Sequence, residues 1–151
     1  MSKSVVKALP VIAVTIRRAT LLDKPSIEGV YATIVGTSLV LDDEEWSRWF
    51  SQAGILVAEE NNRIIGFGGI DVTAEEQLRW VYLLPEFQRG GVGSRILHEL
   101  ETMAWSSGLQ SIRLHSTPGA VQFYAKRGYT RVPDHEHLGH DHDGVEMVKL
   151  R

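Results

Sequence analysis

The chain has 151 residues, of which 43% are hydrophobic and 23% charged, a composition that fits one globular domain of ordinary size. Its net charge of −3 offers no positive field to a nucleic acid, and no apolar run approaches the length of a membrane span. There is no cysteine, which excludes disulfides, thiolate metal sites and a cysteine nucleophile. We therefore expect a cytoplasmic protein that binds neither nucleic acid nor membrane.

The first ten residues differ from the rest of the chain. They combine lysines with aliphatic residues, as a signal peptide does, but Lys7 and Pro10 interrupt the apolar stretch and no small-residue cleavage site follows. We expect residues 1–10 to form a flexible N-terminal arm and residues 11–151 to form a single domain.

The first half of that domain is predicted to start with a strand and two helices. Val11–Arg17 is rich in β-branched residues, which favours a strand. Apolar residues at helical spacing follow Pro25 and end near Gly36, and a proline suits the first turn of a helix. The acidic run Asp42–Glu45 predicts the start of a second helix, because negative charge complements the positive end of the helix dipole.

Three strands are predicted next. Ile55–Glu59 and Arg63–Asp71 are separated by Asn61-Asn62, which suits a tight hairpin turn. Leu78–Leu84 combines aromatic and aliphatic residues and ends before a proline.

The second half alternates helix and strand. An apolar stripe at helical spacing predicts a long helix over Val92–Ser106. The strand, short helix and closing hairpin expected after it cover Ser111–Ser116, Pro118–Arg127, Thr130–His137 and Val145–Leu150. This order predicts a mixed α/β domain in which about four helices flank a central mixed sheet.

The glycine-rich segment Gln88–Gly93 leads from the strand Leu78–Leu84 directly into the long helix. The first turn of a helix leaves its N–H groups unpaired at the positive end of the dipole, and glycines let the backbone approach a ligand closely. Arg89 adds a positive charge. The segment therefore predicts a bound phosphate or pyrophosphate, although a turn that binds nothing is the alternative. It lacks the Lys-Ser/Thr pair of a Walker A loop and the early G-x-G-x-x-G of a dinucleotide site.

Gln88–Gly93 resembles the Q/R-x-x-G-x-G/A signature of the GNAT N-acetyltransferase superfamily. Val81–Glu86 is similar to the strand that leads into that signature, and Phe123–Tyr129 resembles the later F-Y-x-K-x-G-F/Y segment. Ile16–Asp23 is similar to the first strand of the family and its exit. The resemblance covers residues from about Thr15 to Leu150.

The resemblance implies an acetyl-CoA-dependent N-acetyltransferase that moves an acetyl group to a primary amine by direct attack in a ternary complex. Acetyl-CoA is then a co-substrate, and no metal is expected. The residues implied to bind it are Leu83, Leu84, Gln88, Arg89, Gly90, Gly91, Val92, Gly93 and Ser94. The alternative is a coenzyme-A-binding sensor or regulatory module without turnover.

Tyr124 aligns with the family tyrosine that lies near the coenzyme sulfur and can act as general acid. A phenol, with a reference pKa near 10, is a plausible donor to a thiolate whose conjugate acid lies near 8.5. The alternative is a tyrosine that packs against the ligand and transfers no proton.

The general base is sought among four residues: Asp71, Glu75, Glu76 and His115. Amines of the lysine type reach the enzyme protonated and must lose a proton, often through water to a carboxylate. We favour Glu76 because it precedes the central strand and is expected to flank the acceptor groove. The acids are alternatively solvated turn residues, and His115 a strand histidine without a catalytic role.

Several other features are left open by the sequence. Many family members open the last helix with an asparagine, whereas here Thr117 and Pro118 are expected to cap it. The His/Asp-rich stretch 134–143 is expected to be a solvated hairpin loop, with a metal site or an acidic rim for a cationic amine as alternatives. Trp46 and Trp49 are expected to pack in the core, although Trp49 is also a candidate for the edge of the acceptor groove.

The sequence leaves the oligomeric state open, and the strands near the C-terminus could pair across a homodimer.

Overall fold

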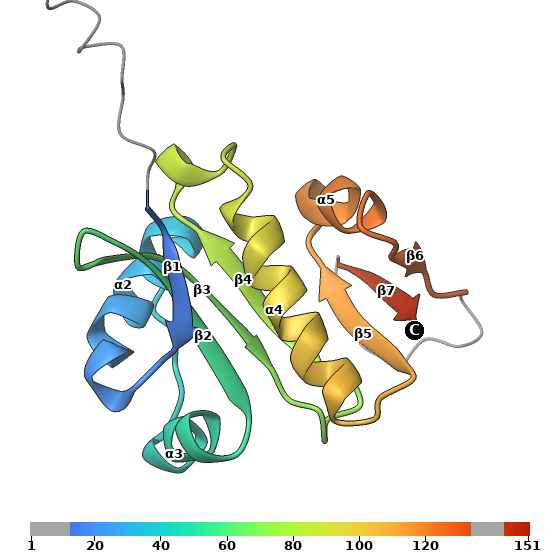
Figure 1. Ribbon diagram of the computed structural model, residues 1–151, viewed down its shortest axis with the longest axis horizontal. Helices are drawn as coiled ribbons and strands as arrows, with labels where there is room; N and C mark the ends of the chain where they lie inside the picture. Colours follow the sequence, from blue (N-terminus) through green and yellow to red (C-terminus); the bar gives the residue numbers. More distant parts are fainter. Residues whose placement is uncertain (1–12, 134–143) are drawn as a thin grey trace, which may run out of the picture.

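The computed structural model describes residues 13–133 and 144–151, so the predicted N-terminal arm (residues 1–10) and the histidine-rich stretch (residues 134–143) lie outside it. One seven-stranded sheet crosses the molecule in the order β1-β2-β3-β4-β5-β7-β6 (Figure 1). The strands are β1 (Thr15–Arg18), β2 (Gly54–Glu60), β3 (Arg63–Ile70), β4 (Leu78–Leu83), β5 (Ser111–Ser116), β6 (Thr130–Arg131) and β7 (Val145–Leu150). The helices are α2 (Lys24–Val35), α3 (Asp43–Ser51), α4 (Val92–Ser106) and α5 (Val121–Ala125).

The predicted order of strands and helices is confirmed. The hairpin turn also has the predicted chemistry, because Asn61 and Asn62 both have positive φ, at 49° and 63°. The short helix differs from its prediction: it begins as a 3-10 turn over Pro118–Ala120 and continues as α5. β6 is shorter than the predicted strand Thr130–His137: it has two residues, Val132 and Pro133 are described but are not in a strand, and residues 134–137 lie outside the described residues.

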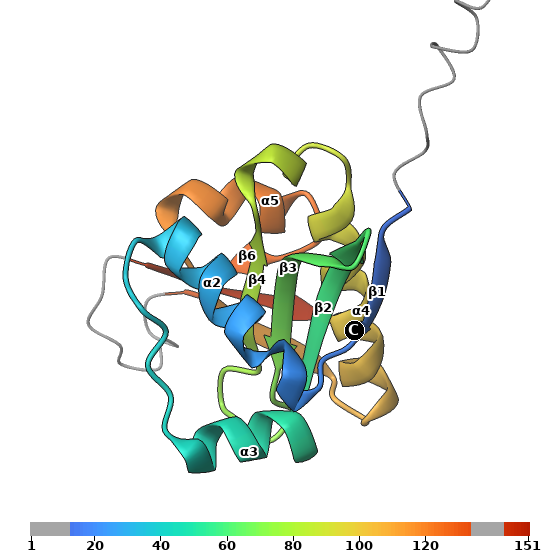
Figure 2. The same cartoon turned by 90° about the vertical axis from the view of Figure 1, so that its left-hand side faces the viewer.

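The helices cover both faces of the sheet, with α2 on one face and α4 on the other (Figure 2). Two adjacent glycines of β3 show how closely they pack. A Cβ added to Gly68 would lie 2.6 Å from a methyl of Ile96 in α4, whereas one added to Gly69 would lie 3.1 Å from the Trp49 ring in α3. Within the described residues, none of the helices combines the length and apolarity that a membrane span requires.

The sheet is almost divided between β4 and β5. These two strands are parallel, all other neighbours are antiparallel, and only Leu78 and Leu114 are paired between them. Arg79 has no partner in β3, since Gly69 pairs with Trp80 and Ile70 with Leu78. Such a bulge bends a strand locally. From this point the C-terminal half of β4 is left without a neighbour on its β5 side.

Candidate functional site

The division between β4 and β5 opens into a cleft of about 360 Å³. Four of the predicted site residues line it: Leu83 of β4, Gln88 of the loop, Gly93 of α4 and Tyr124 of α5. The predicted cofactor segment and the predicted general acid are thus brought together from elements that are distant in sequence.

The backbone of β4 presents polar groups to this cleft at alternate residues. The Leu84 N–H donates to the carbonyl of Ile65 in β3 at 2.9 Å, so the polar groups of Leu84 point toward β3. In an antiparallel pair the direction alternates, which turns the N–H and C=O groups of Leu83 and Val81 toward the cleft. The resemblance implied cofactor contacts by both Leu83 and Leu84; because the Leu84 N–H is bonded to β3, the Leu83 N–H is the one of the two that faces the cleft.

Gln88 fixes the start of the loop. Its side-chain Nε2 donates to the Leu83 carbonyl at 3.0 Å, which uses the acceptor of that residue and leaves its N–H facing the cleft. The resemblance gave Gln88 as a cofactor residue, and the structure shows that its side chain also holds the loop against β4.

The glycine-rich turn ends at Gly91, which is the N-cap of α4 and has a φ of 83°. The first intrahelical hydrogen bond runs from the Arg95 N–H to the Gly91 carbonyl at 3.1 Å, so the amides of Val92, Gly93 and Ser94 have no acceptor within the helix. Side chains added at Gly90 or Gly91 would meet nothing within 4 Å, which leaves open space for a ligand here. Arg89 is exposed beside this space.

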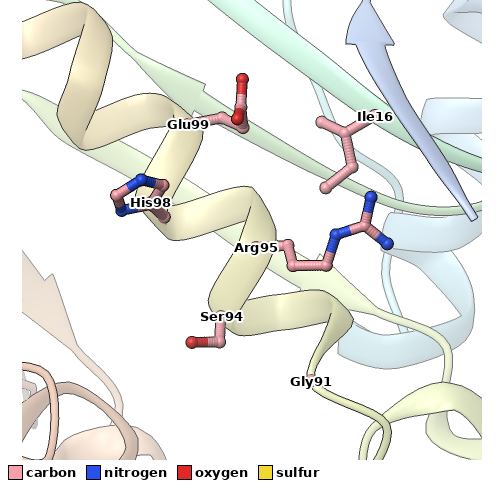
Figure 3. A pocket seen from close by; sticks show the side chains of 6 residues that line it. All are labelled: Ile16, Gly91, Ser94, Arg95, His98 and Glu99. Atoms are coloured by element: carbon pink, nitrogen blue, oxygen red, sulfur yellow. The ribbon is translucent and has the colours of Figure 1, made fainter.

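Gly93 lies next to an aromatic ring. A Cβ at this position would lie 3.5 Å from the edge of Phe123, which is ordinary van der Waals contact. Figure 3 shows Gly91, Ser94 and Arg95 along the start of α4, where the helix borders a hollow next to β1. The first turn of α4 is therefore accessible from outside while its other side contacts α5.

Tyr124 is buried, with 9% of its surface exposed, and its ring packs edge-on against Phe123 and Tyr129 at centroid distances of 5.1 and 5.6 Å. Burial, and then the neighbouring Tyr82, raise the pKa of its phenol well above the usual value. The hydroxyl therefore stays protonated at neutral pH, which is the state that a hydrogen-bond donor or general acid needs.

Glu76 is not brought to this cleft. Its carboxylate lies 3.8 Å from Nδ1 of His115, near the N-terminal end of β4, and both side chains are largely buried. The six residues of β4 separate this end from Leu83 by roughly 17 Å of extended chain. The structure thus groups the two base candidates Glu76 and His115 with each other and leaves them away from Tyr124.

Asp71, another candidate base, is held in a network of its own. Its carboxylate accepts hydrogen bonds from Arg48 and from the Thr73 hydroxyl, the latter at 2.7 Å. Burial raises the pKa of Asp71, but these hydrogen bonds outweigh it and hold the pKa below the usual value. This ion pair ties α3 to the end of β3.

Two further expectations concern packing. Trp46 and Trp49 are both buried, at 2% and 4% exposure, and Trp49 packs on Trp80 at 4.6 Å, so both belong to the core. Thr117 is the N-cap of the turn before α5, but its side chain makes no capping bond. The predicted cap position is confirmed, and the turn is closed by the Ala120 N–H, which donates to the Thr117 carbonyl at 3.0 Å.

Sequence reasoning missed Arg127. Its Nε donates to the Ser94 hydroxyl at 3.0 Å, so it connects α5 to the first turn of α4. The residue lies within the Phe123–Tyr129 segment, but the pattern of that segment specifies other positions, and its partner is 33 residues away.

The family model of the acetyltransferase (GNAT) domain matches residues 24–151. The chain belongs to the GNAT acetyltransferase family. Among curated relatives of this GNAT chain, a mycothiol acetyltransferase of Streptomyces griseus is 36% identical over 97 residues, which cover 60% of this chain and 31% of that protein. A mycothiol acetyltransferase of Streptomyces coelicolor is 32% identical over 102 residues, covering 66% and 30%. The aligned region thus spans about a third of the length of these relatives.

Solved structures share the fold of this GNAT domain. N-acetylglutamate synthase from Neisseria gonorrhoeae, in complex with coenzyme A and N-acetyl-glutamate, has a TM-score of 0.75 at 20% identity, over 93% of this chain and 36% of that one. The PaiA N-acetyltransferase of Thermoplasma acidophilum, in complex with coenzyme A, has a TM-score of 0.70 at 20% identity, over 93% and 100%. At this identity the likeness concerns the fold.

Proposed function

We propose that this chain is an acetyl-CoA-dependent N-acetyltransferase that passes an acetyl group to a primary amine within a ternary complex. The observation that carries the proposal is the pairing of two features at one place. The unpaired amides of Val92, Gly93 and Ser94 suit a pyrophosphate, and the adjoining cleft between β4 and α5 exposes the backbone of Val81 and Leu83. Membership of the GNAT family supports the same conclusion.

Acetyl-CoA supplies the thioester whose carbonyl carbon the amine attacks. The protein's part is to position the reacting groups and to stabilise the charge that develops on them. The Leu83 N–H is directed at the cleft and would stabilise the negative charge that develops on the carbonyl oxygen. As the carbon–sulfur bond breaks, the thiolate needs a proton, and the Tyr124 hydroxyl holds one in the same cleft. Arg89 would add charge next to the phosphates.

The amine must also lose a proton. We keep Glu76 as the proposed acceptor of that proton. Because its carboxylate lies beside His115 at 3.8 Å, near the end of β4 far from Leu83, the proton would have to reach it through water. We further propose that the protein works in the cytoplasm, where acetyl-CoA is available for the reaction. We also propose that it forms a homodimer, which sedimentation of the purified chain tests. The alternative function, a coenzyme-A sensor, uses the same loop and lacks turnover.

Calorimetric titration with acetyl-CoA tests the central proposal. We expect saturable binding by the native chain and loss of binding in Gly91→Glu, whose carboxylate would face the pyrophosphate. Gly108→Glu is the matched control, because Gly108 also has positive φ, at 97°, and open space around it, but lies beyond the other end of α4. It carries the same charge and a similar backbone strain. No binding by the folded native chain would refute the proposal.

A measurement of turnover distinguishes the enzyme from the sensor. Since the chain has no cysteine, a thiol reagent reports the coenzyme A released from acetyl-CoA without reaction with the protein. A panel of amines, from α-amines to polyamines, should include at least one that releases thiol in stoichiometric amounts with its acetylated product. Binding of acetyl-CoA without release for any amine would favour the sensor.

A further inference from the structure

Two hollows open from the first turn of α4, one on each side of the helix, and Ser94 and His98 line both. We name each hollow by the element that faces α4 across it. The β1 flank, of about 610 Å³, is completed by Ile16, Gly91, Arg95 and Glu99 (Figure 3). The α5 flank, of about 230 Å³, is completed by Leu97, Glu101, Arg127 and Lys149. A ligand whose pyrophosphate lies on this turn has one hollow on either side that could receive its nucleotide end.

The charges of the β1 flank cancel. It contains one arginine and one glutamate, and the side chains of Arg95 and Glu99 both reach the side of α4 that faces Ile16 (Figure 3). The Arg95 side chain already has a partner within the protein, because its Nη2 donates to the carbonyl of Val14 at 3.0 Å. An additional anion gains little here.

The α5 flank has an excess of positive charge. Arg127 and Lys149 outnumber the one carboxylate, that of Glu101. This carboxylate is compensated within the protein, because it accepts from the Tyr129 hydroxyl at 2.8 Å and from Lys149 Nζ at 3.2 Å. The remaining positive charge is that of Arg127.

The Arg127 guanidinium is held in place before any ligand arrives. Nε donates to Ser94 Oγ at 3.0 Å, Nη1 donates to the Phe123 carbonyl at 2.6 Å, and the group lies 3.9 Å from the centre of the Phe123 ring. A guanidinium has five N–H donors, so these two bonds leave three for another acceptor. A planar, fixed fork of this kind suits the bidentate recognition of a phosphate.

We propose that the α5 flank binds the phosphate on the 3′ position of the ribose of coenzyme A, and that Arg127 selects cofactors that carry this phosphate. The proposal rests on the proposed function, since it requires the pyrophosphate on the first turn of α4. It assigns to Arg127 a specificity role that is separate from the acyl transfer at Tyr124.

Titration of the full chain with coenzyme A and with 3′-dephospho-coenzyme A tests the proposal. We expect the native chain to prefer coenzyme A by about tenfold, the effect of a charge-assisted hydrogen bond. Arg127→Gln should reduce this preference to about twofold or less, and Arg127→Lys should keep part of it because the charge remains. Arg95→Gln on the β1 flank is the matched control and should leave the preference unchanged. The preference should also decline as salt is added.

Three results would overturn the proposal. The first is a native chain that binds both ligands equally. The second is an Arg127→Gln variant that loses affinity for both ligands by the same factor, since Arg127 would then only fasten α5 to α4. The third is loss of the preference in Arg95→Gln, which would direct the nucleotide to the β1 flank. Failure of the native chain to bind either ligand is a different outcome, because it refutes the proposed function itself. Thermal unfolding of each variant verifies that it is folded.

Discussion

A methyl group at Gly68 should move α4 and weaken coenzyme binding. The added Cβ would lie 2.6 Å from a methyl of Ile96, 2.8 Å from a methyl of Leu100 and 3.0 Å from the carbonyl oxygen of Trp80. Carbon atoms in contact are separated by about 3.5–4.0 Å, so the two methyls of α4 must retreat by about 1 Å. Both side chains are fully buried, which leaves displacement of the helix as the available response. Overpacking of this kind destabilises a protein by about 1–3 kcal/mol.

The adjacent residue provides the control. A Cβ at Gly69 would lie 2.7 Å from the Trp80 ring and 3.1 Å from the Trp49 ring, which are on the opposite face of the sheet. Gly68→Ala and Gly69→Ala should therefore lower the unfolding temperature by similar amounts. Only Gly68→Ala should displace the amides that begin α4, and a shift of about 1 Å takes a hydrogen bond beyond its useful range.

Thermal unfolding and calorimetry with acetyl-CoA measure the two effects separately. We expect Gly68→Ala to bind about tenfold more weakly, or worse, at a temperature where both variants are folded, and Gly69→Ala to bind like the native chain. Unchanged affinity in a destabilised Gly68→Ala would refute the link between the packing of α4 and the cofactor. Equal weakening in both variants would show a general loosening of the domain.

Three further predictions concern ionisable groups. Tyr124→Phe should lower kcat by about 100-fold with little change in acetyl-CoA affinity if the phenol is the general acid, whereas a packing role alone leaves kcat within a few-fold. Glu76→Gln should lower kcat/KM by about 100-fold if Glu76 accepts the amine proton through water; a loss of less than about tenfold would refute this role and would agree with its position near the end of β4 far from Leu83. Burial, and then the hydrogen bond to Glu101, raise the pKa of Tyr129. The unfolded chain ionises this phenol first, so stability should be complete below about pH 10 and decline as the pH rises above it, and Tyr129→Phe should flatten that decline in chemical denaturation.

The sequence predicted the fold because its local signals agree with one another. The apolar stripe over Val92–Ser106 gave the bounds of α4, and the two asparagines at 61 and 62 gave the hairpin turn. The order of elements followed from such signals together with the positions of proline and glycine. What the sequence could not give is the direction of backbone groups: the amides of Leu83 and Leu84 are adjacent in the chain, but pairing with β3 turns them to opposite sides.

Site residues that belong to a recognisable motif were predicted from the sequence. Contacts between residues that are far apart in the chain were missed. Gln88–Gly93 and Tyr124 were found through a resemblance, and the structure places members of both along one cleft. The contact between Arg127 and Ser94 depends on how α5 packs against α4, which no local pattern encodes. Glu76 was favoured from its position before a strand, but the end of the strand that it precedes is the one distant from the loop.

The single paired position between β4 and β5 makes the domain two antiparallel half-sheets that share an incomplete seam. Gln77 closes one end of this seam, since its side-chain oxygen accepts from the Arg113 N–H at 2.9 Å. Along the rest, β4 is paired with β3 on one side, but the backbone groups on its β5 side have no strand among the described residues paired with them. An extended ligand that bonds to Val81 and Leu83 would occupy the place of the missing neighbour. Cofactor binding would then complete the sheet, and the two halves should unfold at a higher temperature, and more cooperatively, with the cofactor than without it.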